Sequence, residues 1–322
     1  MSPRPLFSAL RAMRPKQWTK NVVVLAAFVF ALGDRQQSVA WSAIWHAVQA
    51  TLFFCLASSG VYLLNDVRDL PLDRAHPKKR FRPIAAGELR IPAALGLSAV
   101  LLAVSLTGSW MLSRDLALVI GGYVVLQMVY TLGLKRVALV DIFVIAAGFV
   151  LRALAGAVAV RATISPWLLL CTLLLALFLA LCKRRHEKVV LSDSRLGLAS
   201  AKPSAEPGEA YGGAWVGGET RESLGQYDER LLDQLIAIVS AATLVCYALY
   251  TLWPDTVEKF GTAKLGLTIP FVIFGLFRYL DIVYRHEKGD RPEQILLTDA
   301  PLLVALVLYG LTVLAVLLTA RP

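Results

Sequence analysis

The residues best suited to chemistry lie in one polar stretch, residues 65–87, which reads NDVRDLPLDRAHPKKRFRPIAAG. Asp66, Asp69 and Asp73 are spaced at i, i+3 and i+7, so a helix would place them within about 60° of one another, with Asn65 beside them. Their oxygen atoms are ligands typical of Mg²⁺, which binds one or two carboxylates together with phosphate oxygens. We therefore predict that these four residues hold Mg²⁺, and that Mn²⁺ can substitute for it.

A basic cluster follows the acidic one. Lys78, Lys79, Arg80 and Arg82 fall within five residues, and their side chains are suited to phosphate. The two clusters together predict a site for a Mg²⁺–diphosphate group, with Lys78, Arg80 and Arg82 on the phosphates. The alternative is a solvated loop in which the opposite charges merely neutralise one another, and the helical spacing of the acids argues against it.

Two further basic stretches supply candidate substrate-binding residues. RPKQWTKN, residues 14–21, brings Lys16, Lys20 and Asn21 to the start of an apolar segment, where they either bind phosphate or anchor the chain at the membrane surface. CKRRHEKVV, residues 182–190, contains Lys188, and membrane topology alone would explain its charges.

Asp141 and Arg152 are ionisable residues inside an apolar segment, where a charge costs several kcal/mol and is functional by default. Eleven residues separate them, which is about 16 Å along a helix, too far for a direct pair. Both could line one cavity; the alternative is a charge pair with another helix. Tyr130 and Lys135 precede Asp141 in YTLGLKRVALVDI and complete the candidates.

The composition indicates the elements that must position these residues. Of 322 residues 57% are hydrophobic and only 17% are charged, with a mean hydropathy of +0.61, so we predict an all-α integral membrane protein. A net charge of +10 in such a protein indicates topology and anionic partners, not nucleic acid. The four cysteines lie in apolar runs without metal-ligand spacing, and we expect no disulfide.

Nine apolar segments are long enough, or nearly so, to cross a bilayer. They are residues 18–33, 41–64, 92–112, 115–134, 139–160, 165–182, 230–253, 265–284 and 299–319. With the N-terminus inside and the C-terminus outside, 25 of the 33 Lys and Arg residues fall on the cytoplasmic side and six on the other, as the positive-inside rule requires. Residues 189–226, rich in Gly, Ser, Ala and Pro, are predicted to be a flexible cytoplasmic insertion in a single domain, residues 1–322.

The motifs together resemble a known superfamily. NDxxDxxxD after the second apolar segment, followed by YTLGLKR and a later Asp, is similar to the UbiA-type intramembrane prenyltransferases. Within that superfamily RPKQWTKN, LVDIFVIAAGFVLRALAGAVA and FRYLDIVYRHEKGDRPEQILLTDAPLL look like the decaprenyl-phosphate phosphoribosyltransferase branch. The resemblance covers nearly the whole chain except residues 189–226.

The resemblance implies nine helices around a cavity open to the cytoplasm, in the cell (inner or plasma) membrane. It implies transfer of 5-phosphoribose from phosphoribosyl pyrophosphate to a polyprenyl phosphate, for lipid-linked arabinose donors and cell-wall polysaccharide. We expect Asp66, Asp73 and Asp141 to be catalytic. The sequence leaves a homo-oligomer open.

One position departs from the superfamily pattern. The second motif is commonly DxxxD, but Val137 stands four residues before Asp141, so Asp141 could accept hydrogen bonds from ribose instead of holding a second metal ion. The first rival function is an aromatic prenyltransferase that uses a polyprenyl diphosphate, for which the metal chemistry would be the same. The second is a lipid or anion transporter, for which internal repeats would be expected and none is convincing.

Overall fold

The computed structural model describes residues 5–35, 39–76, 79–163, 165–200, 225–285, 295 and 298–320, with only the helix path for 190–200. All regular structure in this part of the chain is helical. Eight of its helices are long and apolar enough to cross a membrane, with mean hydropathies of 1.6 to 2.7 over their most apolar windows. The prediction of an all-α membrane protein is confirmed.

The long helices follow one another through the chain, and only the connections from α5 to α8 are short. They are α3 (Ala43–Arg68), α5 (Ile91–Leu112), α6 (Arg114–Leu132), α7 (Val140–Ala159), α8 (Pro166–Ser200), α10 (Glu229–Leu252), α12 (Ile269–Arg285) and α14 (Ala300–Thr319). The shorter ones are α1 (Pro5–Ala12), η1 (Pro15–Val22), α2 (Val23–Leu32), α4 (Leu70–Ala75), η2 (Lys79–Phe81), η3 (Leu134–Arg136), α11 (Pro254–Phe260) and η4 (Lys264–Thr268). Prolines stand in the first turn of α5, α8, α11 and α14, where a missing N–H costs nothing.

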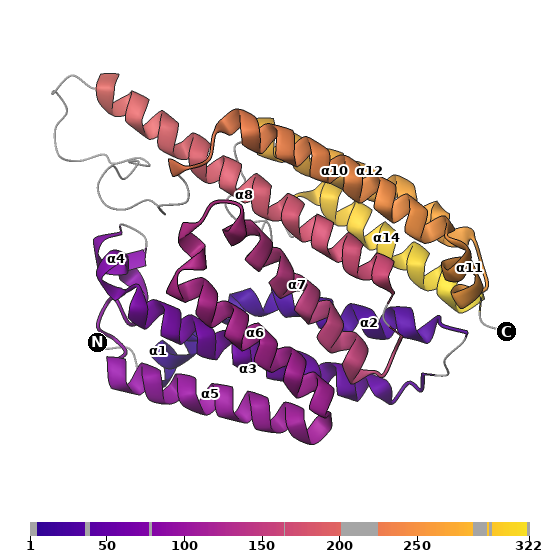
Figure 1. Cartoon of the computed structure of the whole chain (residues 1–322), viewed down its shortest axis with the longest axis horizontal. Helices are drawn as coiled ribbons and strands as arrows, with labels where there is room; N and C mark the ends of the chain where they lie inside the picture. Colours follow the sequence, from indigo (N-terminus) through magenta and orange to yellow (C-terminus); the bar gives the residue numbers. More distant parts are fainter. Residues whose placement is uncertain are drawn as a thin grey trace.

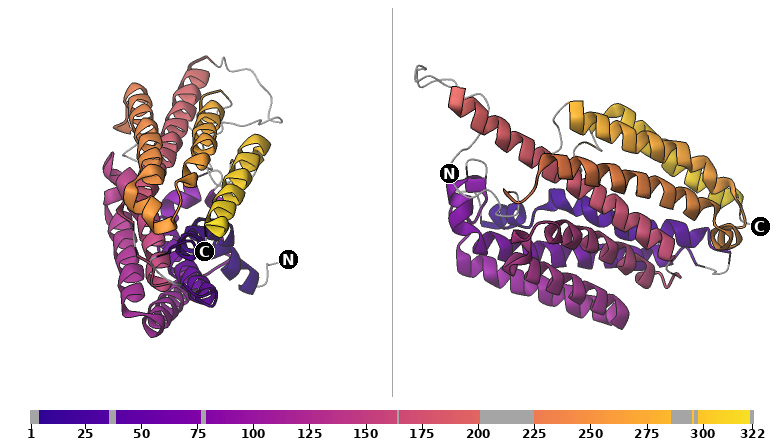
Figure 2. Two further views of the ribbon diagram at one scale, coloured as in Figure 1. Left: turned by 90° about the vertical axis from the view of Figure 1, so that its right-hand side faces the viewer. Right: turned by 45° about the horizontal axis from the view of Figure 1, so that its top comes forward.

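The long helices run side by side along the longest axis of the molecule (Figure 1). α3 packs against α5 and α6, α7 packs against α2, α6 and α8, and α8 packs against α10 (Figure 2). α4 lies at one end of this bundle and α11 at the other (Figure 1). We call these the α4 end and the α11 end; the polar residues of interest gather towards the first.

The first predicted segment, residues 18–33, is not among the eight long helices. It folds as η1, which starts after Arg14 in a left-handed conformation (φ 55°), and then as α2, which has only ten residues. α2 lies so close to α7 that a Cβ atom added at Gly156 would overlap the Val24 carbonyl oxygen. The count of nine spans and their orientation stay predictions.

The sixth predicted segment ends later than expected. The hydropathy of the sequence predicts an end at residue 182 and its composition a flexible insertion from residue 189, but α8 continues to Ser200 and extends beyond the bundle (Figure 1). The first part of the predicted insertion is therefore helical. Residues 201–224 lie outside the described residues, and so the flexible insertion stays a prediction there.

Candidate functional site

The three predicted metal-binding carboxylates lie where α3 gives way to α4. α3 ends at Arg68 and α4 begins at Leu70, so the acids do not share one uninterrupted helix. The helical path is nevertheless kept, because Asp69 N–H donates to the Asn65 carbonyl (2.8 Å) and Asp73 N–H donates to that of Asp69 (2.8 Å). Asp66 and Asp73 are buried, at 3% and 2% exposure. The predicted clustering is thus present for Asp66 and Asp73, whereas Asp69 is half-buried.

A guanidinium group lies between the two buried carboxylates. Arg82 Nη1 is 3.1 Å from Asp66 Oδ1 and 2.7 Å from Asp73 Oδ2, so one nitrogen contacts both acids. Arg14, which precedes η1, also donates to Asp66 Oδ1, and its guanidinium stacks on the Tyr62 ring at 5.1 Å. The acids thus sit inside a network of cations, as buried carboxylates must.

The turn between α6 and α7 completes this cluster. Lys135 Nζ is 2.6 Å from Asp69 Oδ1, and the Thr131 hydroxyl donates to Asn65 Oδ1. We refer to Asn65, Asp66, Asp69 and Asp73 with Arg14, Arg82 and Lys135 as the acid–base cluster. Segments some seventy residues apart in sequence meet here, since Lys135 and Asp69 are separated by 66 positions.

Asp141 belongs to a second, fully buried cluster. Its Oδ2 accepts from Arg184 Nε of α8 (2.8 Å) and its Oδ1 from the Tyr227 hydroxyl (2.7 Å). Arg184, at 1% exposure, also pairs with Glu187. Burial and the hydrogen bond to Asp141 raise the pKa of Tyr227, which keeps its hydroxyl protonated as a donor. Asp141 therefore forms a charge pair with another helix, the alternative left open by its sequence.

Arg152 lies deeper in the bundle, apart from Asp141. Its Nε donates to Asn21 Oδ1 (2.7 Å), its Nη1 to the Gly148 carbonyl (2.7 Å) and its Nη2 to the Tyr123 hydroxyl (3.2 Å). It is 5% exposed and stacks on the ring of Phe54 at 5.1 Å. The two residues that the sequence placed in one cavity thus have separate partners.

The remaining predicted substrate-binding residues divide into three groups. Lys16 and Arg80 are exposed, and Arg80 stacks on Phe81 at 4.9 Å away from the acids, so the structure does not bring these two into the cluster. Lys20 and Lys188 are half-buried. Lys78 lies outside the described residues. Arg82, two residues on, contacts the acids, and the predicted phosphate-binding role of Arg80 stays a prediction.

Tyr130 carries a polar atom that the fold leaves unsatisfied. Its hydroxyl is buried and, in the part of the chain that the structure describes, has no hydrogen-bond partner. A buried hydroxyl without a partner costs about 1–3 kcal/mol, so it is a natural contact for a bound polar molecule. The substrate-binding role of Tyr130 stays a prediction.

Sequence reasoning missed three members of these clusters. Arg14 and Arg184 were seen only as part of basic stretches that topology would explain, and Tyr227 gave no signal at all. The available signal for Arg184 was its position directly after the apolar part of α8. A buried carboxylate such as Asp141 needs a cationic partner, and Arg184 is close enough to the apolar part to supply it. Nothing in the sequence around Tyr227 indicates its contact.

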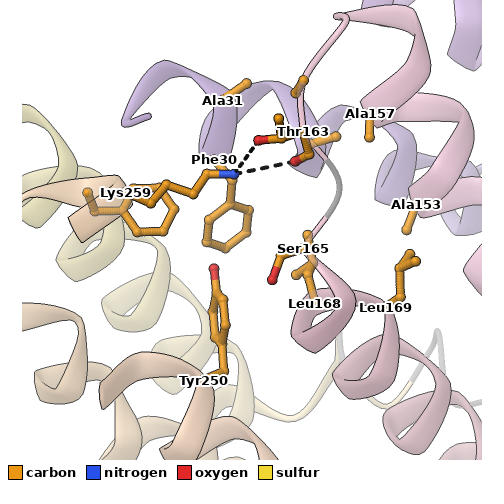
Figure 3. Close-up of a pocket in the computed structure, with 13 residues that line it drawn as sticks. Phe30, Ala31, Ala153, Ala157, Thr163, Ser165, Leu168, Leu169, Tyr250 and Lys259 are labelled. Carbon is orange, nitrogen blue, oxygen red and sulfur yellow. Dashed lines mark hydrogen bonds between the residues drawn. The ribbon is translucent and has the colours of Figure 1, made fainter. Parts of the chain in front are cut away.

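A small cavity is lined in part by Lys259 and Phe260 of α11 and by no member of either cluster (Figure 3). Apolar side chains of α2, α7 and α8 form most of its wall, and the Lys259 amino group donates to the Thr163 hydroxyl (3.1 Å) and carbonyl (3.3 Å) beside it. Its volume of about 30 Å³ suits a water molecule and not a nucleotide-sized or lipid-sized substrate. We therefore place no reaction here.

The acid–base cluster has the chemistry of a magnesium site. Within the described residues no three His, Cys, Asp or Glu side chains converge as a ready-made ligand group. Mg²⁺, however, commonly uses one or two protein carboxylates together with substrate phosphates. Asp66 and Asp73 meet that need, because one nitrogen atom already contacts an oxygen of each, and a cation at that point would do the same. The donor set therefore fits Mg²⁺.

Comparisons with known proteins identify the family of the chain. The model of the UbiA prenyltransferase family matches residues 22–200. The chain is 36% identical over 305 residues to the decaprenyl-phosphate phosphoribosyltransferase of Mycolicibacterium smegmatis (92% of this chain, 88% of that protein). It is 37% identical over 290 residues to that of Mycobacterium tuberculosis (90% and 87%).

A solved structure shares the fold. The UbiA homolog from Archaeoglobus fulgidus, solved with GPP and Mg²⁺, superposes with a TM-score of 0.66 at 19% identity, over 96% of this chain and 99% of that one. Its likeness concerns the fold alone. With the family match and the two relatives, it follows that this multi-pass membrane protein belongs to the UbiA prenyltransferase family, a family of transferases.

Proposed function

We propose that this protein transfers 5-phosphoribose from phosphoribosyl pyrophosphate to a polyprenyl phosphate, with decaprenyl phosphate as the expected acceptor, and releases diphosphate. The names of the relatives, at 36–37% identity over nine-tenths of the chain, support this reading. The lipid product would serve as a precursor of lipid-linked arabinose and so of cell-wall polysaccharide. The acid–base cluster would face the cytoplasm, where the water-soluble donor is made.

The observation that carries the proposal is Arg82 between Asp66 and Asp73. Without a ligand, Arg14 and Arg82 neutralise the carboxylates. When Mg²⁺–diphosphate binds, the carboxylates would turn to the metal, and the two guanidinium groups would turn to the phosphate oxygens that match their planar donors. Both sets of charges would then stay paired in a buried site.

Asn65, Asp66, Asp69 and Asp73 would hold Mg²⁺, which neutralises charge on the leaving diphosphate. An oxygen of the lipid phosphate forms the new bond to C1 of the ribose while the bond from C1 to the diphosphate oxygen breaks, so a single displacement inverts C1. The acceptor is already an anion near neutral pH and needs no general base. The residues of the chain therefore bind, orient and neutralise, and none is required to take a proton.

Two further groups would hold the substrates. Lys135 contacts Asp69 and would contact the donor, and Tyr130, whose buried hydroxyl is unpartnered among the described residues, would offer it a further hydrogen bond. Arg152 is a buried cation whose partners among the described residues are neutral, namely Asn21, Tyr123 and the Gly148 carbonyl. A buried charge of this kind favours an anion. We propose that it attracts a phosphate of the substrates.

The decisive experiment incubates membranes that contain the protein with labelled phosphoribosyl pyrophosphate, polyprenyl phosphate and Mg²⁺. We expect a lipid-extractable, ribose-labelled product that depends on both substrates and disappears with EDTA. A parallel incubation supplies a labelled polyprenyl diphosphate and an aromatic acceptor. Labelled product only in the second incubation would overturn the proposal and indicate an aromatic prenyltransferase. If neither incubation gives product, the proposal is overturned and the transporter is the remaining hypothesis.

A further inference from the structure

The turn that leads into α7 has an unusual backbone. Leu139 has φ 65° and ψ −46°, and Val140 N–H donates to the Ala138 carbonyl at 2.8 Å. This is a γ-turn of the positive-φ form, which is rare and strained for a residue with a side chain. Strained backbone of this kind persists only where its surroundings hold it in place.

Two consecutive residues from a distant part of the chain supply that hold. Gln226 Oε1 accepts from Ala138 N–H (3.3 Å), and the Tyr227 hydroxyl accepts from Leu139 N–H (2.6 Å). The same Tyr227 hydroxyl donates to Asp141 Oδ1 at 2.7 Å. Tyr227 is 3% exposed and lies just before α10, so it ties α10 to the turn.

The strained turn lies between one residue of the acid–base cluster and one residue of the Asp141 cluster. Lys135, which precedes it in η3, contacts Asp69 of the acid–base cluster. Asp141, which follows it in the first turn of α7, contacts Arg184 of α8. A change in the backbone at Leu139 would therefore move Lys135 relative to Asp141, because only five positions lie between them.

We infer that Tyr227, assisted by Gln226, is a positioning residue: it locks the Leu139 turn and thereby sets Lys135 and Asp141 for the phosphoribosyl donor. The effect on the donor rests on the proposed function; the contact with the turn does not. Tyr227 itself does not touch the reacting atoms in this role. Its loss should weaken donor binding more than it slows the bond-breaking step.

The test compares two substitutions, each of which removes a tyrosine hydroxyl that donates a hydrogen bond to a carboxylate. Tyr227→Phe should raise the donor KM and lower kcat/KM about ten- to a hundredfold, with the KM for polyprenyl phosphate little changed. Tyr284→Phe is the matched control, because Tyr284 donates to Asp233 at 2.7 Å away from the turn. It should change kcat/KM by no more than about threefold.

A second substitution tests the role of strain. Glycine adopts positive φ without cost, so Leu139→Gly in the Tyr227→Phe background should recover about half of the lost kcat/KM on a logarithmic scale. If Tyr227 instead took part directly in proton transfer, kcat would fall, its pH profile would move, and Leu139→Gly would recover nothing. That result would overturn the inference.

Hydrogen exchange supplies a readout that needs no activity. In Tyr227→Phe the amides of residues 138–139 should exchange about tenfold or more faster than in wild type, while Tyr284→Phe leaves them unchanged. If the wild type shows no phosphoribosyl transfer while the amides of Tyr227→Phe exchange faster, the proposed function is overturned and the contact between Tyr227 and the turn is kept. Unchanged exchange together with an unchanged donor KM would overturn the inference and keep the function.

Discussion

One nitrogen of Arg82 contacts both buried carboxylates, at 3.1 Å from Asp66 Oδ1 and 2.7 Å from Asp73 Oδ2. The acids belong to α3 and α4, and Arg82 follows η2, so this contact holds the polar segment to the end of the bundle. It also means that the proposed metal ligands and the proposed phosphate donors neutralise each other before any ligand arrives.

Replacing Arg82 should therefore affect donor binding before anything else. Arg82→Lys keeps the charge but loses the planar pair of donors, and we expect the donor KM to rise about tenfold or more. Arg74→Lys is the matched control, since Arg74 is exposed on α4 next to Asp73. Steady-state kinetics of both variants would check this, and equal donor KM values would contradict the assigned role of Arg82.

The two buried carboxylates should be essential. Asp66→Asn and Asp73→Asn should each lower kcat/KM by about a hundredfold or more, and shift the Mg²⁺ activation curve to higher concentration, because a metal ligand is lost. EDTA should stop turnover of the wild type, and Mg²⁺ or Mn²⁺ should restore it. Transfer that persists in the chelator would exclude the metal-dependent mechanism.

The acidic motif shows both what the sequence could predict and where it stopped. The spacing of Asp66, Asp69 and Asp73 indicated their clustering, because helical periodicity is local. The sequence alone predicts solvent-exposed acids at a helix end, and replacing such acids by Ala would not lower the stability of the protein. The burial of Asp66 and Asp73 and their pairing with Arg82 contradict that expectation, so these substitutions should also lower thermal stability.

The long-range partners lay beyond sequence reasoning for a physical reason. Arg184 and Tyr227 reach Asp141 from 43 and 86 positions away, and such contacts depend on how α7, α8 and α10 pack, which no local period encodes. The membrane helices themselves were predictable, because an apolar run of the length of a bilayer is a one-dimensional signal. The bounds of the short α2 and the long α8 were not, because α2 is shorter than a bilayer span and α8 continues past its apolar part to Ser200.

Asp141 gives a prediction that separates a ribose contact from a metal ligand. Asp141→Asn should raise the donor KM and lower kcat/KM about ten- to a hundredfold, with the Mg²⁺ half-saturation point unchanged. Because it leaves Arg184 with one carboxylate fewer, it should also lower stability. The double variant Asp141→Asn, Arg184→Gln should regain stability without activity. A large shift in the Mg²⁺ curve would instead make Asp141 a metal ligand.

The α11 end should respond in stability and not in catalysis. Lys259 Nζ is 3.2 Å from Asp34 Oδ2, whose side chain is fully buried. Lys259→Met removes that cation, and breaking a buried pair costs up to about 3–5 kcal/mol. Thermal unfolding in detergent should show a lower Tm, while the donor KM of the folded protein stays at the wild-type value. A changed KM would link this end to the reaction.

The last prediction concerns residues 203–222, whose Gly, Ser, Ala and Pro content indicates a linker. Deleting them, with a short Gly/Ser connection in their place, should leave kcat/KM within about threefold of wild type, because such segments seldom build sites. Gln226 and Tyr227 must stay, since they hold the Leu139 turn. Adding Tyr227→Phe to the deletion should raise the donor KM as it does in the full chain. If the deletion alone abolishes transfer in a folded protein, the segment contributes to the site and the linker prediction is wrong.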